Sequence, residues 1–345
     1  MATHSQAIQI CLTVLQGSWN DTSATARAAD ESGLHSIGIA DSPMVVRDMH
    51  LACAACALNT SKTKIITGVT NPVTRHPSVM ASAFLQLEEL APERIICGIA
   101  TGDSALWGVG LKPAKLAELR EYIVAVKALL RGERADWKGS SFSAIWSQFE
   151  PFDLPVYVAC AGPKSIHMAA QVADGLILSV GIAPEDLDWA RQRIEASCAE
   201  IGRDPSELDV WQYTEITFAE SAAAAAENSL GSFSHWLTLC GTAGKRIPEE
   251  YKPLLAKLNL DTEDLQAAYG TEGRGRIMVK RAKELGLYDW IASRSPRLWG
   301  TPKEVRARLE ELRALGASKW MLFPEGTALD DAAVARGLGE VLALE

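Results

Sequence analysis

Short hydrophobic runs alternate with amphipathic stretches along most of the chain. Most of these runs are rich in β-branched residues and end in glycine, proline or small polar residues, a pattern typical of buried parallel strands. The stretches between them carry apolar residues at helical spacing. Strands are therefore predicted at residues 8–14, 36–40, 64–69, 94–101, 156–160, 175–180, 208–218 and 319–323.

Helices are predicted between these strands, at residues 24–32, 45–59, 78–90, 113–130, from 164 or 165 onward, 184–201, 302–315 and about 330–344. Eight strands that alternate with helices predict a closed (β/α)8 TIM barrel, a single domain over residues 1–345. A doubly wound open sheet is the alternative. The absence of a G-x-G-x-x-G motif after the first strand argues against that alternative.

Two segments break the alternation and are predicted to be insertions. Residues 221–298 separate the seventh and eighth strands, and their alanine-rich and charged stretches predict a helical insertion. Residues 132–153 have poor periodicity and are predicted to form a loop. The aromatic side chains of this loop either pack as a small cluster or overhang a ligand, and packing is favoured. These aromatic residues are Trp137, Phe142, Trp146, Phe149 and Phe152.

Charge and composition exclude several classes of partner. The net charge of −9 argues against nucleic acid, because phosphate binding needs a basic face. No apolar run approaches the roughly 20 residues of a membrane span, and the N-terminus lacks the pattern of a signal peptide. The odd number of cysteines, 7, fits reduced thiols in the cytoplasm. Cys53 and Cys56 form a C-x-x-C inside an alanine-rich helical stretch, which favours packing, and no metal site is predicted.

Candidate chemistry lies where the predicted strands end. In residues 64–77 (KIITGVTNPVTRHP) a buried strand stops at Thr70 and Asn71, and Pro77 opens a helix. Ligands of TIM barrels bind at the carboxyl ends of the strands, so polar and small residues there are expected to converge on one site. These residues are Asp41, Gly68, Val69, Thr70, Asn71, Gly102, Asp103, Ser104, Ala161, Gly162, Pro163, Lys164, Ser165, Ser179, Val180 and Gly181.

The segment 161–165 is the best candidate for a phosphate site. A helix that starts there offers free N–H groups and the positive end of its dipole. Gly162 lets the backbone approach closely, Lys164 adds charge, and Ser165 adds a hydroxyl. Residues 179–181 would complete this cradle. An ordinary Gly-Pro turn that caps a helix is the alternative interpretation.

The chain resembles the luciferase-like flavin-dependent oxidoreductases, in particular the branch that includes methylenetetrahydromethanopterin reductase. The resemblance runs from about Ile8 to the last helix and is carried by GVTNPVTRHP, LQLEELAPERIICGIATGDSALWGVGLKPA and PVYVACAGPKSIHMAAQVADGLILSVG. It implies a flavin or deazaflavin whose phosphate lies at 161–165 and 179–181, and a helical insertion over the barrel mouth. It also implies a non-proline cis peptide at Gly68–Val69 behind the ring. Dimers or tetramers through the second and third helices are expected by the same resemblance.

The cofactor prediction rests on the end of the second strand. Relatives that use the deazaflavin F420 usually have an Asp-His pair there, whereas this chain has Asp41-Ser42. Reduced FMN and dioxygen are therefore predicted, in a two-component monooxygenase that is fed by a separate flavin reductase. Its substrate is expected to be a small organic molecule of aromatic or heterocyclic type. The alternatives are an F420-dependent reductase or dehydrogenase that transfers hydride, and a non-catalytic flavin-binding protein.

Site roles follow from this hypothesis. Thr70 and Asn71 would bond the ring or orient dioxygen. Asp103 would accept a hydrogen bond from ring or substrate, or would cap its own loop through Ser104. His76 is a candidate general acid or base, although a histidine beside a helix start is more often structural, and the same holds for His235. The residues expected to keep water out are Trp107, Trp146 and Trp236.

Overall fold

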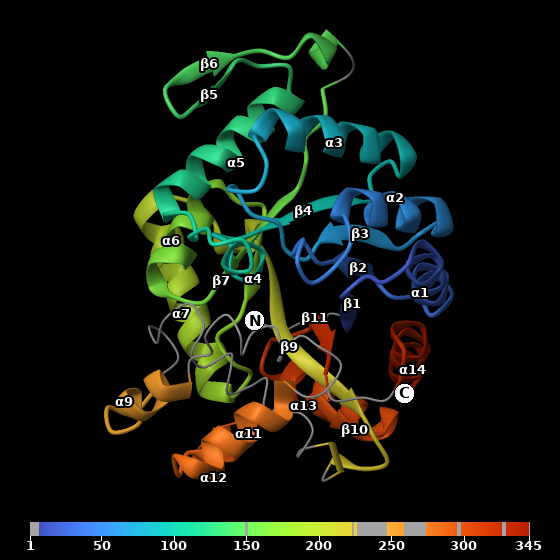
Figure 1. Cartoon of the computed structure of the whole chain (residues 1–345), viewed down its shortest axis with the longest axis vertical. Helices are drawn as coiled ribbons and strands as arrows, with labels where there is room; N and C mark the ends of the chain where they lie inside the picture. The colour runs from blue at the N-terminus through green and yellow to red at the C-terminus, as the bar shows by residue number, and fades with distance from the viewer. Residues whose placement is uncertain are drawn as a thin grey trace.

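The computed structural model describes residues 7–148, 151–222, 224–225, 247–258, 274–294, 298–325 and 329–344. Within these ranges, eight parallel strands pair in the order β1-β2-β3-β4-β7-β8-β9-β11, and β11 pairs back to β1 to close a barrel (Figure 1). The predicted TIM barrel is therefore confirmed. The strands are β1 Gln9–Val14, β2 Ser36–Ile39, β3 Lys64–Thr67, β4 Ile95–Ile99, β7 Val156–Cys160, β8 Gly175–Leu178, β9 Asp209–Phe218 and β11 Lys319–Pro324.

Helices surround this barrel at positions close to those predicted. They are α1 Trp19–Glu31, α2 Met49–Asn59, α3 Pro77–Leu90, α5 Leu116–Leu130, α6 Pro163–Val172, α7 Pro184–Ile201, α13 Pro302–Ala314 and α14 Asp331–Ala343, with the short α4 Ser104–Trp107 and the 3-10 helix η2 Pro205–Glu207 between them. The largest difference is α1, which begins at residue 19 and not at 24. It begins early because Ser18 and Asp21 form a capping box that satisfies its first N–H groups.

The core has two layers. The outer layer lies between strands and helices, where the buried faces of α2, α3 and α5 meet the barrel. The inner layer fills the barrel itself, as alternate residues of each strand point inward. Its buried members are Cys11, Ile66, Ile96, Tyr157, Ile177, Trp211 and Met321. Cys53 and Cys56 are buried in α2, and burial raises the pKa of the Cys56 thiol to about 12. The packing role predicted for this C-x-x-C is thus confirmed.

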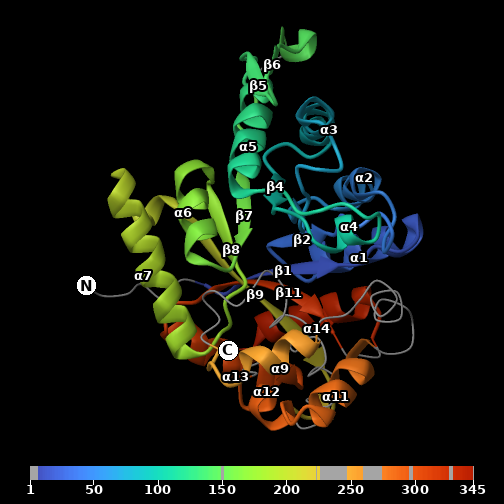
Figure 2. The same cartoon turned by 60° about the vertical axis from the view of Figure 1, so that its left-hand side comes forward.

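The first insertion differs from prediction. It contains an antiparallel hairpin of β5 Ala135–Trp137 and β6 Ser140–Phe142, followed by the 3-10 helix η1 Ile145–Gln148. Lys138 and Gly139 both have positive φ, which makes the tight turn between the two strands. Figures 1 and 2 show this hairpin beyond α5, away from the barrel.

The aromatic residues of this insertion pack against the body of the protein. The ring of Trp137 lies edge-on to Tyr122 of α5, at 5.3 Å between centroids. Trp137 belongs to the main hydrophobic core, and Phe142, Trp146 and Phe152 pack against it. They therefore form no separate cluster, and Phe149 lies outside the described residues.

The described part of the second insertion is mainly helical, as predicted. It contains α9 Lys252–Leu255, η3 Ala256–Leu258, α11 Arg274–Glu284 and α12 Tyr288–Arg294, and it ends in β10 Leu298–Gly300, which extends the sheet beside β9. These helices share a small core of their own, formed by Ile247, Leu255, Leu258, Ala282, Leu287 and Ile291. His235 and Trp236 lie outside the described residues. Among the described helices, none combines the length and the apolar character that crossing a membrane requires.

A polar cluster lies at the amino ends of the strands, opposite the expected site. Asp209 accepts hydrogen bonds from Trp211 (3.0 Å) and Lys319 (2.6 Å), and the ring of His35 lies 4.9 Å from that of Trp211. Burial lowers the pKa of His35 from 6.5 to about 4, and the nearby Lys64 adds to this effect. Between about pH 4 and pH 6.5, the folded protein thus holds a neutral histidine where the unfolded chain would hold a charged one.

This histidine predicts a specific loss of stability in acid. Between its ordinary pKa and its folded value, the unfolded chain takes up a proton that folded His35 does not, so the free energy of unfolding falls as pH falls. Between about pH 7 and about pH 5 the expected loss through this residue is about 2 kcal/mol. Urea unfolding of the wild type and of His35→Gln at both pH values measures it. An equal acid loss in both proteins would contradict the prediction.

Candidate functional site

Loops from three neighbouring strands meet at the carboxyl end of the barrel. Thr70, three residues beyond the end of β3, exchanges backbone hydrogen bonds with Gly98 of β4 and with Ala100 just after it. Its hydroxyl donates to Asp41, which follows β2. The Cβ of Asn71 lies 3.2 Å from where a side chain at Gly102 would begin. The structure therefore brings Asp41, Thr70, Asn71 and Gly102 together, as the sequence predicted.

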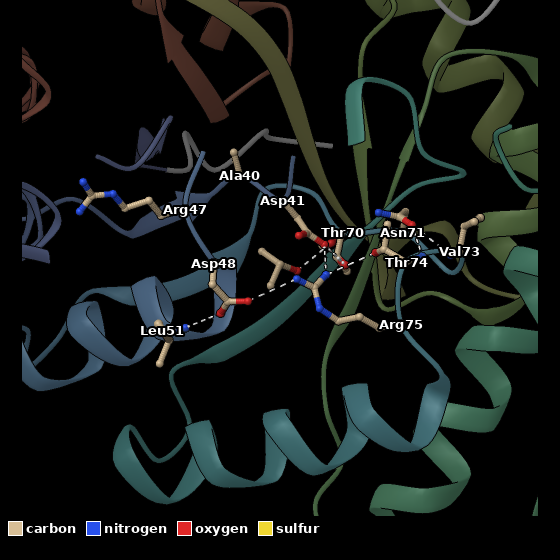
Figure 3. Close-up of polar contacts among 12 residues, drawn as sticks. Ala40, Asp41, Arg47, Asp48, Leu51, Thr70, Asn71, Val73, Thr74 and Arg75 are labelled. Atoms are coloured by element: carbon tan, nitrogen blue, oxygen red, sulfur yellow. Dashed lines mark hydrogen bonds and ion pairs between the residues drawn. The ribbon is translucent and has the colours of Figure 1, made fainter. Parts of the chain in front are cut away.

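Asp41 is the charged centre of this group. Its side chain is 2% exposed, and its Oδ2 oxygen accepts from Thr70 Oγ1 at 2.7 Å and from Arg75 Nη1 at 2.6 Å (Figure 3). The second guanidinium nitrogen of Arg75 lies 3.7 Å from Asp48, the residue that caps α2. A buried charge is stable only when it is paired and hydrogen-bonded, which Arg75 and Thr70 accomplish here.

Asn71 shapes the loop and leaves one donor unused. Its Oδ1 accepts from the backbone N–H groups of Val73 and Thr74, both at 3.0 Å, and holds the turn between β3 and α3 (Figure 3). Its Nδ2 is buried and has no hydrogen-bond partner among the residues that the structure describes. Buried amide donors are rarely left unpaired. This donor therefore fits a bound molecule that offers a hydrogen-bond acceptor, such as a carbonyl of a flavin-type ring.

The peptide bond between Gly68 and Val69 is cis, as predicted. The N–H of Gly68 donates to the carbonyl of Ile39 at 2.7 Å, and Val69 packs against the inner layer of the barrel. The bond lies directly before Thr70 and Asn71, in the loop that follows β3.

Asp103 caps its own loop. Its carboxylate accepts from the N–H and from the hydroxyl of Ser104, the first residue of α4. The hydroxyl of Ser104 also lies 2.8 Å from that of Ser42, which joins the loops after β2 and β4. Of the two roles considered for Asp103, the structure shows the capping contact.

His76 also makes structural contacts. Its Nδ1 accepts from the N–H of Ser78 and so caps α3, and its ring lies 5.1 Å from that of Phe142. These contacts account for a histidine at this position without an acid–base role.

The segment 161–165 starts a helix as predicted, with one difference. Gly162 is the N-cap of α6, and Lys164 in the first turn is exposed. The hydroxyl of Ser165, however, donates to the carbonyl of Gly162 at 2.9 Å and accepts from its N–H at 3.1 Å, so it is already in use. Ala161 and Pro163 flank this cap as the sequence placed them.

The neighbouring loop after β8 is linked to it. Ser179 donates its backbone N–H to the carbonyl of Cys160 at 3.1 Å. The side chain of Val180 is fully buried, so the part of this residue that the predicted cradle could use is its backbone. Gly181 has a φ of +103°, and a side chain there would meet the carboxylate of Asp186, so this position requires glycine.

Two functional candidates were missed from the sequence. Arg75 lies in the loop after β3 that the sequence singled out, but no role was predicted for it. An arginine after one strand and a lone aspartate after the adjacent strand could have suggested the ion pair between Arg75 and Asp41. Gln16, after β1, donates to the carbonyls of Ala40 at 2.8 Å and Arg47 at 2.9 Å and fixes the loop that carries Asp41. No pattern in the sequence indicated this contact.

Comparisons with known proteins identify the family of the chain. Residues 3–319 match the luciferase-like monooxygenase family, and the chain therefore belongs to this family of oxidoreductases. It is 32% identical to 5,10-methylenetetrahydromethanopterin reductase of Methanolobus tindarius over 298 residues, which cover 85% of this chain and 87% of that one.

Two further relatives are named for a deazaflavin. F420-dependent glucose-6-phosphate dehydrogenase of Kineococcus radiotolerans is 31% identical over 240 residues, 63% of this chain and 68% of that one. The structure of coenzyme F420 dependent tetrahydromethanopterin reductase from Methanopyrus kandleri covers 98% of this chain and 99% of that one, with a TM-score of 0.72 and 21% identity, and so supports the fold.

These relatives overturn the predicted FMN-dependent monooxygenase. The prediction gave one residue, Ser42 in place of a histidine, more weight than the likeness of the whole chain. That likeness is to a reductase and to a dehydrogenase, the second of which is named as F420-dependent.

Proposed function

We propose that this protein is an F420-dependent oxidoreductase that transfers hydride between the deazaflavin and a carbon centre of a small organic substrate. A reductase of the methylenetetrahydromethanopterin type is the form that we favour. The observation that carries this proposal is the likeness to the Methanolobus tindarius reductase, which extends over 85% of the chain. The proposed hydride transfer requires neither the dioxygen nor the separate flavin reductase of the monooxygenase prediction.

The reduced cofactor supplies the hydride, and the protein supplies binding and electrostatics. The Nδ2 of Asn71 donates to an acceptor on the ring. Asp41, fixed by Thr70 and Arg75, presents a carboxylate beside it. The first N–H groups of α6 face the phosphate, and the exposed Lys164 adds positive charge.

The chain departs from the F420-using relatives at Ser42, where they usually have a histidine. Here a chain of hydroxyl groups runs from Ser42 through Ser104 to the carboxylate of Asp103. Ser42 cannot act as a base at neutral pH, so a proton that enters or leaves the site has to be handled by another group. Asp103 is the carboxylate at the end of this chain.

The expected assembly is a homodimer or homotetramer through α2 and α3. In support, both helices present large apolar side chains to the surface: Leu51 and Leu58 of α2 are 64% and 63% exposed, and Val79 of α3 is 55% exposed. Apolar residues that gather on adjacent helices are typical of protein interfaces.

Turnover with two reduced cofactors tests the proposal. Purified protein is given methylenetetrahydromethanopterin with reduced F420 or with reduced FMN, and cofactor oxidation is followed without oxygen. Oxidation of F420 that depends on the substrate is expected, with no such reaction of FMN. Oxidation of reduced FMN that depends on the substrate, with reduced F420 left unchanged, would contradict the proposal.

A pair of lysine variants locates the cofactor in the same assay. Lys164→Gln should raise the KM for F420, because it removes the charge at the start of α6. Lys62→Gln removes an equal charge from an exposed lysine just before β3, at the amino end of the barrel, and should leave the KM unchanged.

A further inference from the structure

We propose that Arg75 is a positioning residue: it keeps Asp41 ionised and turned so that its Oδ1 oxygen accepts a hydrogen bond from the ligand at the strand ends. The identity of that ligand as F420 rests on the proposed function. The ionisation state of Asp41 in the ligand-free protein does not depend on the proposed function.

The contacts of Asp41 divide between its two oxygens. Thr70 and Arg75 both donate to Oδ2, at 2.7 and 2.6 Å, whereas Oδ1 accepts no hydrogen bond from any described residue. The carboxylate is thus held from one side, with its second oxygen left to accept. The hydroxyl of Thr70 donates its hydrogen bond to Asp41. The orientation of this hydroxyl therefore also depends on the charge of that carboxylate.

Arg75 is held in place by two other elements. Its backbone carbonyl accepts from the hydroxyl of Tyr122 in α5 at 3.1 Å, and its guanidinium reaches Asp48 at the start of α2. The side chain is 15% exposed, so the ion pair with Asp41 is shielded from solvent. An arginine fixed at both ends can hold a carboxylate in one orientation.

The other titratable groups around Asp41 do not replace Arg75. From α2, burial lowers the pKa of His50 and raises that of Cys53, so that both are neutral near neutral pH. From α5, burial raises the pKa of Tyr122, which is neutral as well. Asp48, the remaining charged group, is an acid and disfavours a second negative charge nearby.

Removal of the arginine charge should therefore change the charge of Asp41. A buried carboxylate without a cation takes up a proton at a pH where its paired form is ionised. Asp41 protonated on Oδ1 would donate a hydrogen bond there, where the ionised form accepts one, while Oδ2 would remain a weaker, uncharged acceptor for Thr70. Ligand binding would then depend on pH in a range where the wild-type protein shows no such dependence.

Three variants test this, with two readouts. Arg75→Gln removes the charge, Arg75→Lys keeps it, and Arg47→Gln removes an equal charge from an exposed arginine whose side chain points away from Asp41 in Figure 3. The first readout is the free energy of unfolding without ligand from about pH 5 to about pH 8. The second is the dissociation constant for F420 over the same range.

The expected results distinguish a positioning role of Arg75 from a general loss of stability. Unfolded Asp41 is ionised throughout this range, so the deficit of Arg75→Gln relative to wild type should grow as pH rises. When Asp41 is replaced by asparagine, the stability deficit caused by Arg75→Gln should no longer increase with pH. The deficit in F420 affinity should be about tenfold larger at the acid end than at the alkaline end. Arg75→Lys should restore the wild-type pH profiles, and Arg47→Gln should keep them.

Parallel pH profiles for Arg75→Gln and wild type, in unfolding and in binding, would overturn the inference. So would a pH-dependent deficit that persists when Asp41 is already asparagine. If wild-type protein does not bind F420, the proposed function fails, and the unfolding profile without ligand still decides the role of Arg75.

Discussion

Replacement of Asp41 by alanine is expected to lower the free energy of unfolding by about 3–5 kcal/mol, the cost of leaving one member of a buried ion pair without its partner. Arg75 would remain in a shielded position with only Asp48, at 3.7 Å, to balance its charge. Thr70, which is fully buried, would lose the acceptor of its hydroxyl. Urea unfolding followed by circular dichroism measures this loss.

Asp103→Ala is the matched control, since it removes a carboxylate from the adjacent loop. Among the described residues, the carboxylate of Asp103 accepts hydrogen bonds only from Ser104 and caps the short α4, and a lost cap costs about 1 kcal/mol. If the two substitutions cost the same, then Asp41 is not the electrostatic centre that the geometry indicates.

Asn71→Asp is expected to weaken F420 binding by about 10- to 100-fold, the effect of one lost hydrogen bond to a buried donor site. An ionised aspartate can still accept from the N–H groups of Val73 and Thr74, so the turn is kept. What disappears is the unpaired Nδ2 donor. The two backbone N–H groups that donate to this side chain favour an ionised aspartate, and a fluorescence titration with F420 at about pH 8 measures the loss.

Asn71→Ala separates the two roles of this side chain. It removes the donor and also both accepted hydrogen bonds, so it should lose F420 affinity to a similar extent but be less stable than Asn71→Asp. Wild-type affinity in Asn71→Asp would show that the Nδ2 of Asn71 does not contact the cofactor.

The barrel could be predicted from the sequence because each strand is a short buried run whose end is marked by polar or small residues. β3, for example, ends beside Thr70 and Asn71, and both residues lie where the pattern placed them. The β5–β6 hairpin could not be predicted in this way. Its strands have three residues each, and its turn depends on a positive φ at Lys138, a residue type that does not signal it.

The side-chain contacts of the site were harder to predict than its location. The pattern placed Asp103 and Ser165 at the carboxyl ends of strands, but their hydrogen bonds turn back onto Ser104 and Gly162. Polar side chains at helix starts often satisfy local backbone groups first. The role of Arg75 depends on a contact across 34 positions of sequence, which no local pattern reveals.

The choice of cofactor failed for a related reason. FMN and F420 share a tricyclic ring with similar hydrogen-bonding edges, so Asn71 and Asp41 suit either molecule. The difference at Ser42 does not decide between the two cofactors. Hydrogen bonds from Ser42 through Ser104 to the carboxylate of Asp103 lie where the relatives usually have the histidine. The likeness over the whole chain carries more weight than one position.

A crystal structure of the protein grown with F420 tests the central claim most directly. We expect the deazaflavin ring at the carboxyl ends of β2, β3 and β4, within hydrogen-bonding distance of Asn71 Nδ2, and the phosphate at the first N–H groups of α6. F420 bound elsewhere, or a ring that leaves the Asn71 amide without a partner, would contradict it.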